Sequence, residues 1–176
     1  MTFDDVLKNL QTKFGAAILG KDETKPDASI KVDGAKILEI AQFLKAEQHF
    51  ESLSCVSGVD YPQAQSICVV YHFFSYTHKL MLPVKVTLPR PTDATGTVAV
   101  PSLCSVYKGA NWLERETYDL IGVTFTGHPE HRRILCPEDW VGYPMRKDYK
   151  TPDYYNGMPV PLYFEDTDAP ASGGTH

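Results

Sequence analysis

The sequence lacks any uninterrupted apolar run of about eighteen residues, the length typical of a membrane-spanning helix. Its most apolar stretch, SICVVYHFF, is half that length and contains His72. The first ten residues, MTFDDVLKNL, are acidic and amphipathic, without the basic start of a secretory signal or the Arg-rich character of a transit peptide. We therefore expect a cytosolic chain, or a mature chain that has already been trimmed, and in either case one that reaches a membrane only through a partner.

Cysteine is scarce and widely spaced. The four cysteines form no C-x-x-C pair and no cluster typical of a local zinc or iron–sulfur motif: Cys55, Cys68, Cys104 and Cys136. The sequence alone does not exclude disulfide bonds, but we expect reduced cysteines that pack as small apolar side chains. We also expect no metal centre in this chain.

Familiar catalytic and nucleotide-binding motifs are absent as well. The sequence contains no G-x-S-x-G, G-x-G-x-x-G or P-loop pattern. Its net charge is −5, and residues 151–176 contain four Asp or Glu residues but no Lys or Arg. An acidic segment of this kind argues against nucleic acid as a partner, because phosphate binding requires basic side chains.

The pattern of apolar residues predicts one α+β domain, and 176 residues are enough to bury a sizeable core. Helical spacing predicts a helix over 3–14 that ends at Gly15, and a second helix within 33–50 that is capped by Asp33. Strands are expected at 29–33, 52–61, 66–76 and 79–89, the last two joined in a hairpin near Thr77. This order predicts a mixed or antiparallel sheet with packed helices.

The second half of the chain changes in character. Residues 101–122 have the pattern of a further helix, broken near Gly109 and ended at Gly122, and a short strand is expected at 123–127. Seven prolines then recur at a density that excludes long helices and central strands. We divide the chain into an α+β domain at 1–125, a loop region at 126–150 with the GHP and RKD elements, and an extended Pro-rich arm at 151–176.

The arm is too apolar for a solvated, disordered tail. Its aromatic and apolar side chains include Tyr154, Tyr155, Met158, Tyr163 and Phe164. One hypothesis is that these residues anchor the arm in a groove on another protein, where tyrosine side chains contribute strongly to binding. The alternative is that the arm folds back on its own domain.

The segment 114–135, ERETYDLIGVTFTGHPEHRRIL, combines dense charge with an apolar pattern. On a helix, Trp112, Arg115, Glu116 and Asp119 share one stripe, and Arg115 and Asp119 have the spacing to pair. An exposed pair of this kind contributes only about 0.3–0.5 kcal/mol, so a buried or interfacial network explains the charge density better.

A catalytic reading of this segment is the alternative. Glu114, Glu116 and Asp119, together with His128 and His131, offer the ligands of a metal-dependent hydrolase. However, the two histidines are three residues apart beside a proline, unlike the H-E-x-x-H pattern on one helix. For each of these residues a structural role is the favoured hypothesis.

The motif E-R-E-x-x-D, two apolar residues, six positions, His, three positions and Arg-x-Ile-Leu resembles the signature of a known family. It is similar to the 30 kDa subunit, also called the C subunit, of respiratory complex I, the proton-pumping NADH:quinone oxidoreductase. The flanking stretches GANWLERE and EDWVGYPMRKDY agree with that family, so the resemblance covers about residues 98–150. The residues that carry it are Glu114, Arg115, Glu116, Asp119, Leu120, Ile121, His128, Arg132, Ile134 and Leu135.

The resemblance implies a peripheral-arm subunit with no catalytic or cofactor-binding residues of its own. FMN, iron–sulfur clusters and quinone would be bound by partner subunits, where electrons pass from NADH to quinone, coupled to proton translocation. The α+β domain would lie beside the 49 kDa-type subunit (the D subunit) and the cluster-bearing subunits near the quinone-reducing junction. The C-terminal arm would extend over that neighbour.

The resemblance also implies a location and leaves the electron donor open. A peripheral membrane protein on the cytoplasmic face of the bacterial inner membrane is expected, or on the matrix or stromal side in an organelle. Relatives in the same family belong to ferredoxin-linked NDH complexes, F420-linked dehydrogenases and membrane-bound hydrogenases. The signature residues are expected to form ionic networks within the chain and at its interfaces: Glu114, Arg115, Glu116, Asp119, His128, Arg132, Arg133, Arg146, Lys147 and Asp148.

Overall fold

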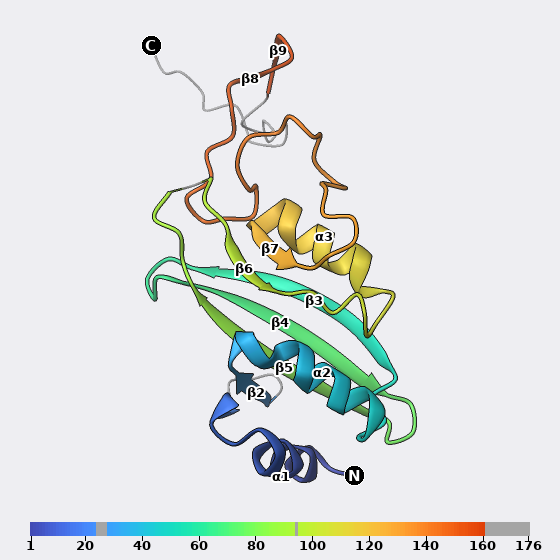
Figure 1. Cartoon of the computed structure of the whole chain (residues 1–176). Helices are drawn as coiled ribbons and strands as arrows, with labels where there is room; N and C mark the ends of the chain where they lie inside the picture. Colours follow the sequence, from blue (N-terminus) through green and yellow to red (C-terminus); the bar gives the residue numbers. More distant parts are fainter. Residues whose placement is uncertain (24–27, 94, 161–176) are drawn as a thin grey trace, which may run out of the picture.

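A computed structural model describes residues 1–23, 28–93 and 95–160 (Figure 1). Its helices are α1 (Phe3–Phe14), α2 (Ile37–Ala46) and α3 (Ala110–Ile121), with short 3-10 turns at Gly15–Ala17 and Gly34–Lys36. The longer strands are β1 (Ile18–Asp22), β2 (Ser29–Val32), β3 (Ser52–Tyr61), β4 (Ser66–Ser75), β5 (Leu80–Pro89), β6 (Val98–Pro101) and β7 (Val123–Thr126). Two short strands follow, β8 (Tyr154–Tyr155) and β9 (Met158–Pro159).

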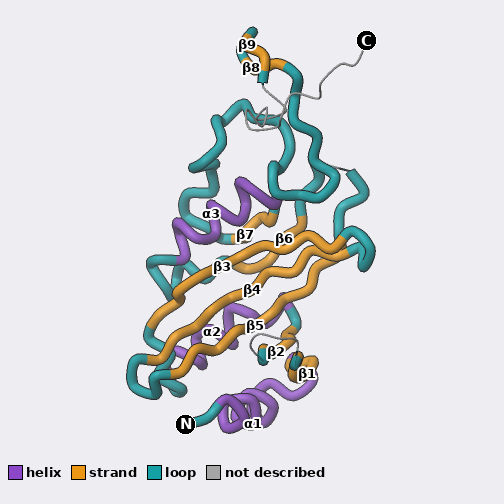
Figure 2. Tube along the Cα trace, turned by 180° about the vertical axis from the view of Figure 1, so that it is seen from behind, coloured by secondary structure: helices purple, strands orange, loops and turns teal. Residues whose placement is uncertain are grey.

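The main sheet has five strands in the order β1-β2-β5-β4-β3. Strands β3, β4 and β5 form an antiparallel meander, whereas β2 pairs with β5 in parallel, so the predicted mixed sheet is confirmed. The hairpin between β4 and β5 is also confirmed, although its loop spans residues 76–79. Figure 2 shows β3, β4 and β5 side by side in front of α2.

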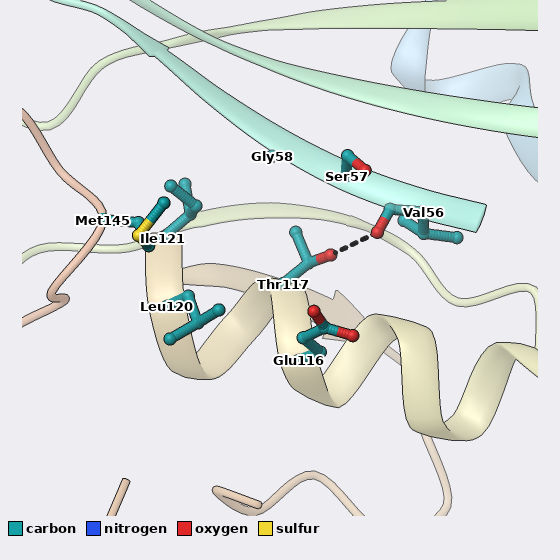
Figure 3. A pocket seen from close by; sticks show the side chains of 8 residues that line it. All are labelled: Val56, Ser57, Gly58, Glu116, Thr117, Leu120, Ile121 and Met145. Carbon is teal, nitrogen blue, oxygen red and sulfur yellow. Dashed lines mark hydrogen bonds between the residues drawn. The ribbon is translucent and has the colours of Figure 1, made fainter. Parts of the chain in front are cut away.

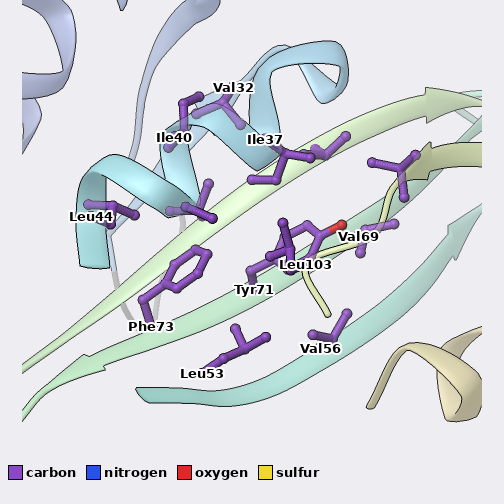
Figure 4. Packing of buried hydrophobic residues seen from close by; sticks show 14 of the residues in the cluster. Val32, Ile37, Ile40, Leu44, Leu53, Val56, Val69, Tyr71, Phe73 and Leu103 are labelled. Carbon is purple, nitrogen blue, oxygen red and sulfur yellow. The ribbon is translucent and has the colours of Figure 1, made fainter. Parts of the chain in front are cut away.

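Strand alternation places the core on one face of this sheet. Ile67, Val69, Tyr71 and Phe73 of β4 are fully buried, because every second side chain of a strand points to the same face. Against that face pack the apolar side chains of α2 (Figure 4): Ile37, Ile40 and Leu44. The burial of this face is the main apolar contribution to stability.

Local capping groups explain where the N-terminal helical segments begin. The Asp33 carboxylate accepts a hydrogen bond from the Ala35 N–H at 3.0 Å, which caps the 3-10 turn that leads into α2. Helix α1 ends at Gly15, as predicted, and begins at a capping box in which Thr2 and Asp5 each bind the other's backbone N–H. The four cysteines are free, as expected.

One expectation was wrong in detail, and one strand was missed. The predicted helix over 101–122 begins only at Ala110, because Val98–Pro101 pairs in parallel with β7 and the next residues turn to contact the middle of α3. Strand β1 was not predicted. It is short, and it pairs only with β2, so its extended form depends on tertiary contacts.

Helix α3 connects the two strands of the small parallel sheet and lies along β3, the edge strand of the main sheet. The Thr117 hydroxyl donates a hydrogen bond to the Val56 carbonyl of β3 at 3.0 Å. Gly58 permits close approach, because a Cβ there would lie 2.9 Å from Cγ1 of Ile121. The position of α3 is therefore fixed by the edge of the sheet.

Residues 127–153 contain no helix or strand, and β8 and β9 form a two-residue hairpin beyond them. The hairpin is joined to the preceding loop by the Tyr155 hydroxyl, which donates to Asp139 at 2.9 Å, and by ring contact with Trp140. Tyr154 and Met158 are exposed. The predicted anchors Tyr163 and Phe164 lie outside the described residues.

Replacement of Gly122 by Ala is expected to lower the free energy of unfolding by about 2 kcal/mol or more. Gly122 ends α3 with a φ of +82°, and a Cβ there would lie 2.6 Å from both Nη2 of Arg146 and Cε2 of Tyr143. Gly127→Ala is the matched control, because its φ is +83° with no atom within 4 Å of the added Cβ. Urea unfolding of both variants measures the difference; equal losses would contradict a packing role for Gly122.

Candidate functional site

Three charged residues of α3 are almost completely buried. Glu114 and Asp119 are 0% exposed and Arg115 is 2% exposed, whereas Trp112 and Glu116 of the same helix are exposed. The predicted charged stripe is therefore divided between the interior and the surface. Buried charges are costly without partners, so the contacts of each one define what it does.

Asp119 is bound by the loop that follows β7. Its Oδ2 accepts hydrogen bonds from the backbone N–H groups of Ile134, Leu135 and Cys136 at 3.1, 2.7 and 2.8 Å. Its Oδ1 accepts from the guanidinium of Arg133. Burial alone would raise the pKa of Asp119, but these donors outweigh burial and lower the pKa below its ordinary value.

Arg133 uses its remaining donors on the next part of the loop. Its Nη2 donates to the carbonyls of Trp140 and Gly142 at 3.0 and 2.9 Å, and its Nη1 also reaches the Asp119 carbonyl. One side chain thus joins the end of α3 to two separate turns of the loop. The planar guanidinium suits this role because it carries five donors and no acceptor.

The predicted pairing of Arg115 with Asp119 is wrong. Arg115 instead donates from Nε to the carbonyl of Arg132 at 3.1 Å and approaches the Glu130 carboxylate at 3.5 Å. Its guanidinium also lies 5.1 Å from the ring of Trp112. Arg132 is exposed and pairs with Glu130 at 2.7 Å. The loop, rather than the helix, supplies the counter-charges of α3.

Glu114 is held by the segment before α3. Its carboxylate accepts hydrogen bonds from the Ser102 hydroxyl and the Leu103 N–H, both at 2.6 Å, and from the Cys104 thiol at 3.5 Å. Burial raises the pKa of Glu114 despite these donors, which are all uncharged groups. Residues 102–104 are thereby fixed in a turn instead of a helix.

Arg146 of the RKD element is 4% exposed and donates to backbone carbonyls. Its Nε donates to Ile121 at 2.7 Å, and its Nη2 donates to Gly96 at 2.6 Å. The ring of Tyr143 lies 4.7 Å from this guanidinium and 5.3 Å from that of Arg133. Arg146 therefore joins the end of α3 to the connection between β5 and β6.

The rest of the RKD element binds a buried ion pair of the main sheet. Asp60 of β3 accepts from Nε and Nη2 of Arg90 at 2.6 and 3.1 Å, and Nη2 also lies 2.7 Å from Asp148. Lys147 contributes its backbone N–H, which donates to Asp60 at 2.9 Å. The hydrogen bonds from Arg90 lower the pKa of Asp60 most, and the Lys147 N–H lowers it further. Together they outweigh burial, which alone would raise this pKa.

The two histidines considered as metal ligands are engaged by the backbone. Nδ1 of His128 accepts from the Glu130 N–H at 3.0 Å, which leaves Nε2 to donate to the Asn111 carbonyl at 3.1 Å. Nε2 of His131 accepts from the Phe125 N–H at 3.2 Å. Burial lowers the pKa of His131, which favours the neutral ring.

One other group has the ligand types of a zinc site: Cys104, Glu114 and His128, whose ligand atoms lie within 4.8 Å of one another. A metal ion there would have to take one His128 nitrogen from its backbone partner and displace the Cys104 thiol proton that is donated to Glu114. These contacts do not fit a preformed metal centre. That the chain binds no cofactor stays a prediction.

The structure brings together most of the predicted residues but adds partners that sequence reasoning missed. Asp60, Arg90, Ser102 and Tyr143 are as central as the motif residues. Sequence spacing does not reveal such partners: Asp60 lies 30 positions from Arg90 and 87 positions from Lys147. Only Tyr143 could have been suspected from the sequence, because it lies between Gly142 and the RKD element.

Comparison with known proteins is consistent across sequence and structure. The family described as "Respiratory-chain NADH dehydrogenase, 30 Kd subunit" matches residues 30–155. The C subunit of the NADH-quinone oxidoreductase of Chlorobium phaeobacteroides is 40% identical over 159 residues, which covers 86% of this chain and 91% of that protein. The C subunit of the F(420)H(2) dehydrogenase of Methanosarcina mazei is 40% identical over 150 residues, covering 82% and 90%.

A solved structure supports the same fold. A chain of the membrane-bound sulfane sulfur reductase, described as an archaeal respiratory membrane complex, superposes with a TM-score of 0.69. It is 25% identical and covers 84% of this chain and 85% of its own length. The predicted α+β fold and the predicted family resemblance are both confirmed.

Replacement of Asp119 by Ala is expected to lower the free energy of unfolding by about 3–5 kcal/mol, because it leaves Arg133 and three N–H groups without their acceptor. Chemical denaturation of the full chain measures this loss. The control is Glu138→Ala, because Glu138 is exposed and has no resolved partner among the described residues. This substitution should change the free energy of unfolding by no more than about 0.5 kcal/mol. Equal effects at the two positions would refute the role of Asp119.

The stability of the chain is expected to fall in acid. Because the pKa of Asp60 is lower in the folded than in the unfolded chain, its contribution is present above about pH 4 and is lost as the pH falls through the lowered pKa. Asp60→Asn should cost roughly 2 kcal/mol near neutral pH, and this difference from the unaltered chain should shrink toward about pH 3. Urea midpoints across that range are the measurement, and a constant difference would contradict the pKa argument.

Proposed function

Because the chain belongs to the 30 kDa subunit family of respiratory-chain NADH dehydrogenase, we propose that it is a non-catalytic, peripheral-arm subunit of a complex I-type NADH:quinone oxidoreductase. It scaffolds the 49 kDa-type subunit near the quinone-reducing junction. Electron transfer to quinone and proton translocation then take place in the assembled complex.

The observation that carries this proposal is that the buried charged side chains make their hydrogen bonds with partners within the chain. The hydrogen bonds of Asp119, Arg133 and Arg146 hold α3 against the loop that follows β7. Those of Glu114 hold α3 against residues 102–104. An acid–base catalyst needs a proton-exchanging group within reach of a substrate. The buried charges of the signature instead fix the shape of a surface, which is what a scaffold subunit requires.

The relatives support a complex whose electron donor is bound elsewhere. One is named for NADH and quinone and another for F(420)H(2), although both are about equally similar to this chain. A subunit that bound the donor itself would be expected to differ between such complexes. FMN, iron–sulfur clusters and quinone accordingly belong to the partner subunits, with NADH as the proposed donor and F420-linked, ferredoxin-linked and hydrogenase complexes as alternatives.

Attachment to the membrane occurs through those partners. Within residues 1–23, 28–93 and 95–160, no helix has both the length and the apolar character needed to cross a membrane. The solved neighbour is a chain of a membrane-bound respiratory complex. We place the subunit on the cytoplasmic face of a bacterial inner membrane, or on the matrix or stromal side in an organelle.

The C-terminal arm is the part of the surface best suited to bind the 49 kDa-type neighbour. Tyr154 is 69% exposed and Met158 is 63% exposed, and both lie in a hairpin that touches the domain mainly through Tyr155. Large apolar side chains that are exposed in such a hairpin gain little from their own domain. On a partner they become buried anchors.

Deletion of residues 151–176 is expected to reduce recovery of the 49 kDa-type and cluster-bearing subunits at least about tenfold when the tagged chain is purified from its host in mild detergent. The reason is the loss of exposed aromatic anchors. The melting temperature of the isolated variant should change by less than about 3 °C, because the described part of the arm, residues 151–160, is joined to the preceding loop mainly by the contacts of Tyr155 with Asp139 and Trp140.

The outcome separates the two hypotheses for the arm. Normal recovery of partners together with a strongly lowered melting temperature would show that the arm packs on its own domain. If even the full-length chain purifies alone, the proposed scaffold function fails. Identification and stoichiometry of the recovered subunits by mass spectrometry provide the measurement.

A further inference from the structure

A cavity of about 190 Å³ lies between α3 and the edge strand β3 (Figure 3). It is formed by the β3 stretch around Gly58, one side of α3 and the side chain of Met145. Met145 is 60% exposed, so the cavity reaches the surface of the chain. The lining residues that matter for its chemistry are Gly58, Glu116, Thr117, Leu120, Ile121 and Met145.

Glu116 is the one ionisable side chain in this lining. It is exposed, and in the part of the chain that the structure describes it has no resolved hydrogen bond or ion pair. Its neighbours on α3 contrast sharply, since Glu114 accepts three hydrogen bonds and Asp119 accepts four from separate groups. The carboxylate of Glu116 is therefore available to a group outside the chain.

The rest of the cavity is largely apolar. Leu120, Ile121 and Met145 form one part of its wall, and the Thr117 hydroxyl is already bonded to the Val56 and Leu113 carbonyls. A narrow apolar space with one carboxylate matches a long aliphatic stem that ends in a cation. Lysine and arginine have this form, because their methylene groups pack on apolar surface while their heads remain charged.

We infer that this cavity receives a lysine or arginine side chain from a neighbouring subunit, with Glu116 as its counter-charge. The inference rests on the proposed function, because it requires an assembled complex. Trp112 supports it: this side chain is 64% exposed, one turn from Glu116 on the same helix face, where it can exclude water from the edge of the contact. An acidic partner would be repelled, and a purely apolar one would leave the carboxylate desolvated and unpaired.

Charge reversal tests the inference in the assembled complex. Glu116→Lys is introduced into the tagged full-length chain, and the complex is purified in mild detergent. We expect at least a tenfold loss of the co-purifying subunits, because a cation would face a cation. Glu39→Lys is the matched control: Glu39 is an exposed helical glutamate on α2 with only a surface pair to Lys36, and normal recovery is expected.

A second variant separates binding from folding. Glu116→Gln keeps the size of the side chain but removes its charge, and the melting temperature of the variant chain should equal that of the unaltered chain because Glu116 has no resolved partner within the described residues. Recovery of the complex should fall by a smaller factor than with Glu116→Lys. The loss of recovered complex on going from low to high salt should also be smaller for Glu116→Gln than for the unaltered chain.

The partner side chain is then located directly. Met145 is replaced by the photo-cross-linker p-benzoylphenylalanine, and the cross-linked peptide of the assembled complex is identified by mass spectrometry. A lysine or arginine at or next to the linked position is the expected result. Normal assembly of Glu116→Lys, with unchanged salt dependence, would overturn the inference, whereas failure of the unaltered chain to recover any partner would overturn the proposed function instead.

Discussion

The hydrogen bonding of one buried carboxylate determines the path of the whole C-terminal loop. Asp119 has no exposed surface, and the only inexpensive way to keep it ionised is to surround it with donors. Three consecutive N–H groups converge on one oxygen, which forces the chain at 134–136 into a tight curve. Arg133 neutralises the charge and extends the contact to two further turns. The surface built by these turns therefore follows from the needs of α3.

Arginine takes the place of regular secondary structure in this region. Residues 127–153 form no strand or helix, so their backbone carbonyls need other donors. Arg115 and Arg133 donate to carbonyls of this region, whereas Arg146 donates from this region to the carbonyls of Ile121 and Gly96. Each guanidinium thus joins segments that are distant in sequence. A motif rich in arginine and carboxylate can thus be an architectural requirement. The same residue types in an open cleft would indicate catalysis.

The sequence was informative wherever the physics is local. Apolar periodicity and the cap at Asp33 predicted α1, α2 and the β3–β4–β5 meander, and the signature predicted the family. Tertiary contacts decided the rest. Four-residue spacing favoured an Arg115–Asp119 pair, but the loop offered Asp119 an arginine and three N–H groups at once. The Asp60–Arg90 pair was inaccessible because it depends on the pairing of separate strands.

The long separations between these partners also set an order of events during synthesis. The chain leaves the ribosome from its N-terminus, so α3 emerges before the residues that bind Asp119, and β3 emerges long before Lys147 reaches Asp60. Until residue 148 is available, the nascent domain carries carboxylates whose full set of donors has not yet been made. Residues 133–148 therefore complete the ionic interior, and a chain interrupted before them lacks the donors that Asp119 and Asp60 require.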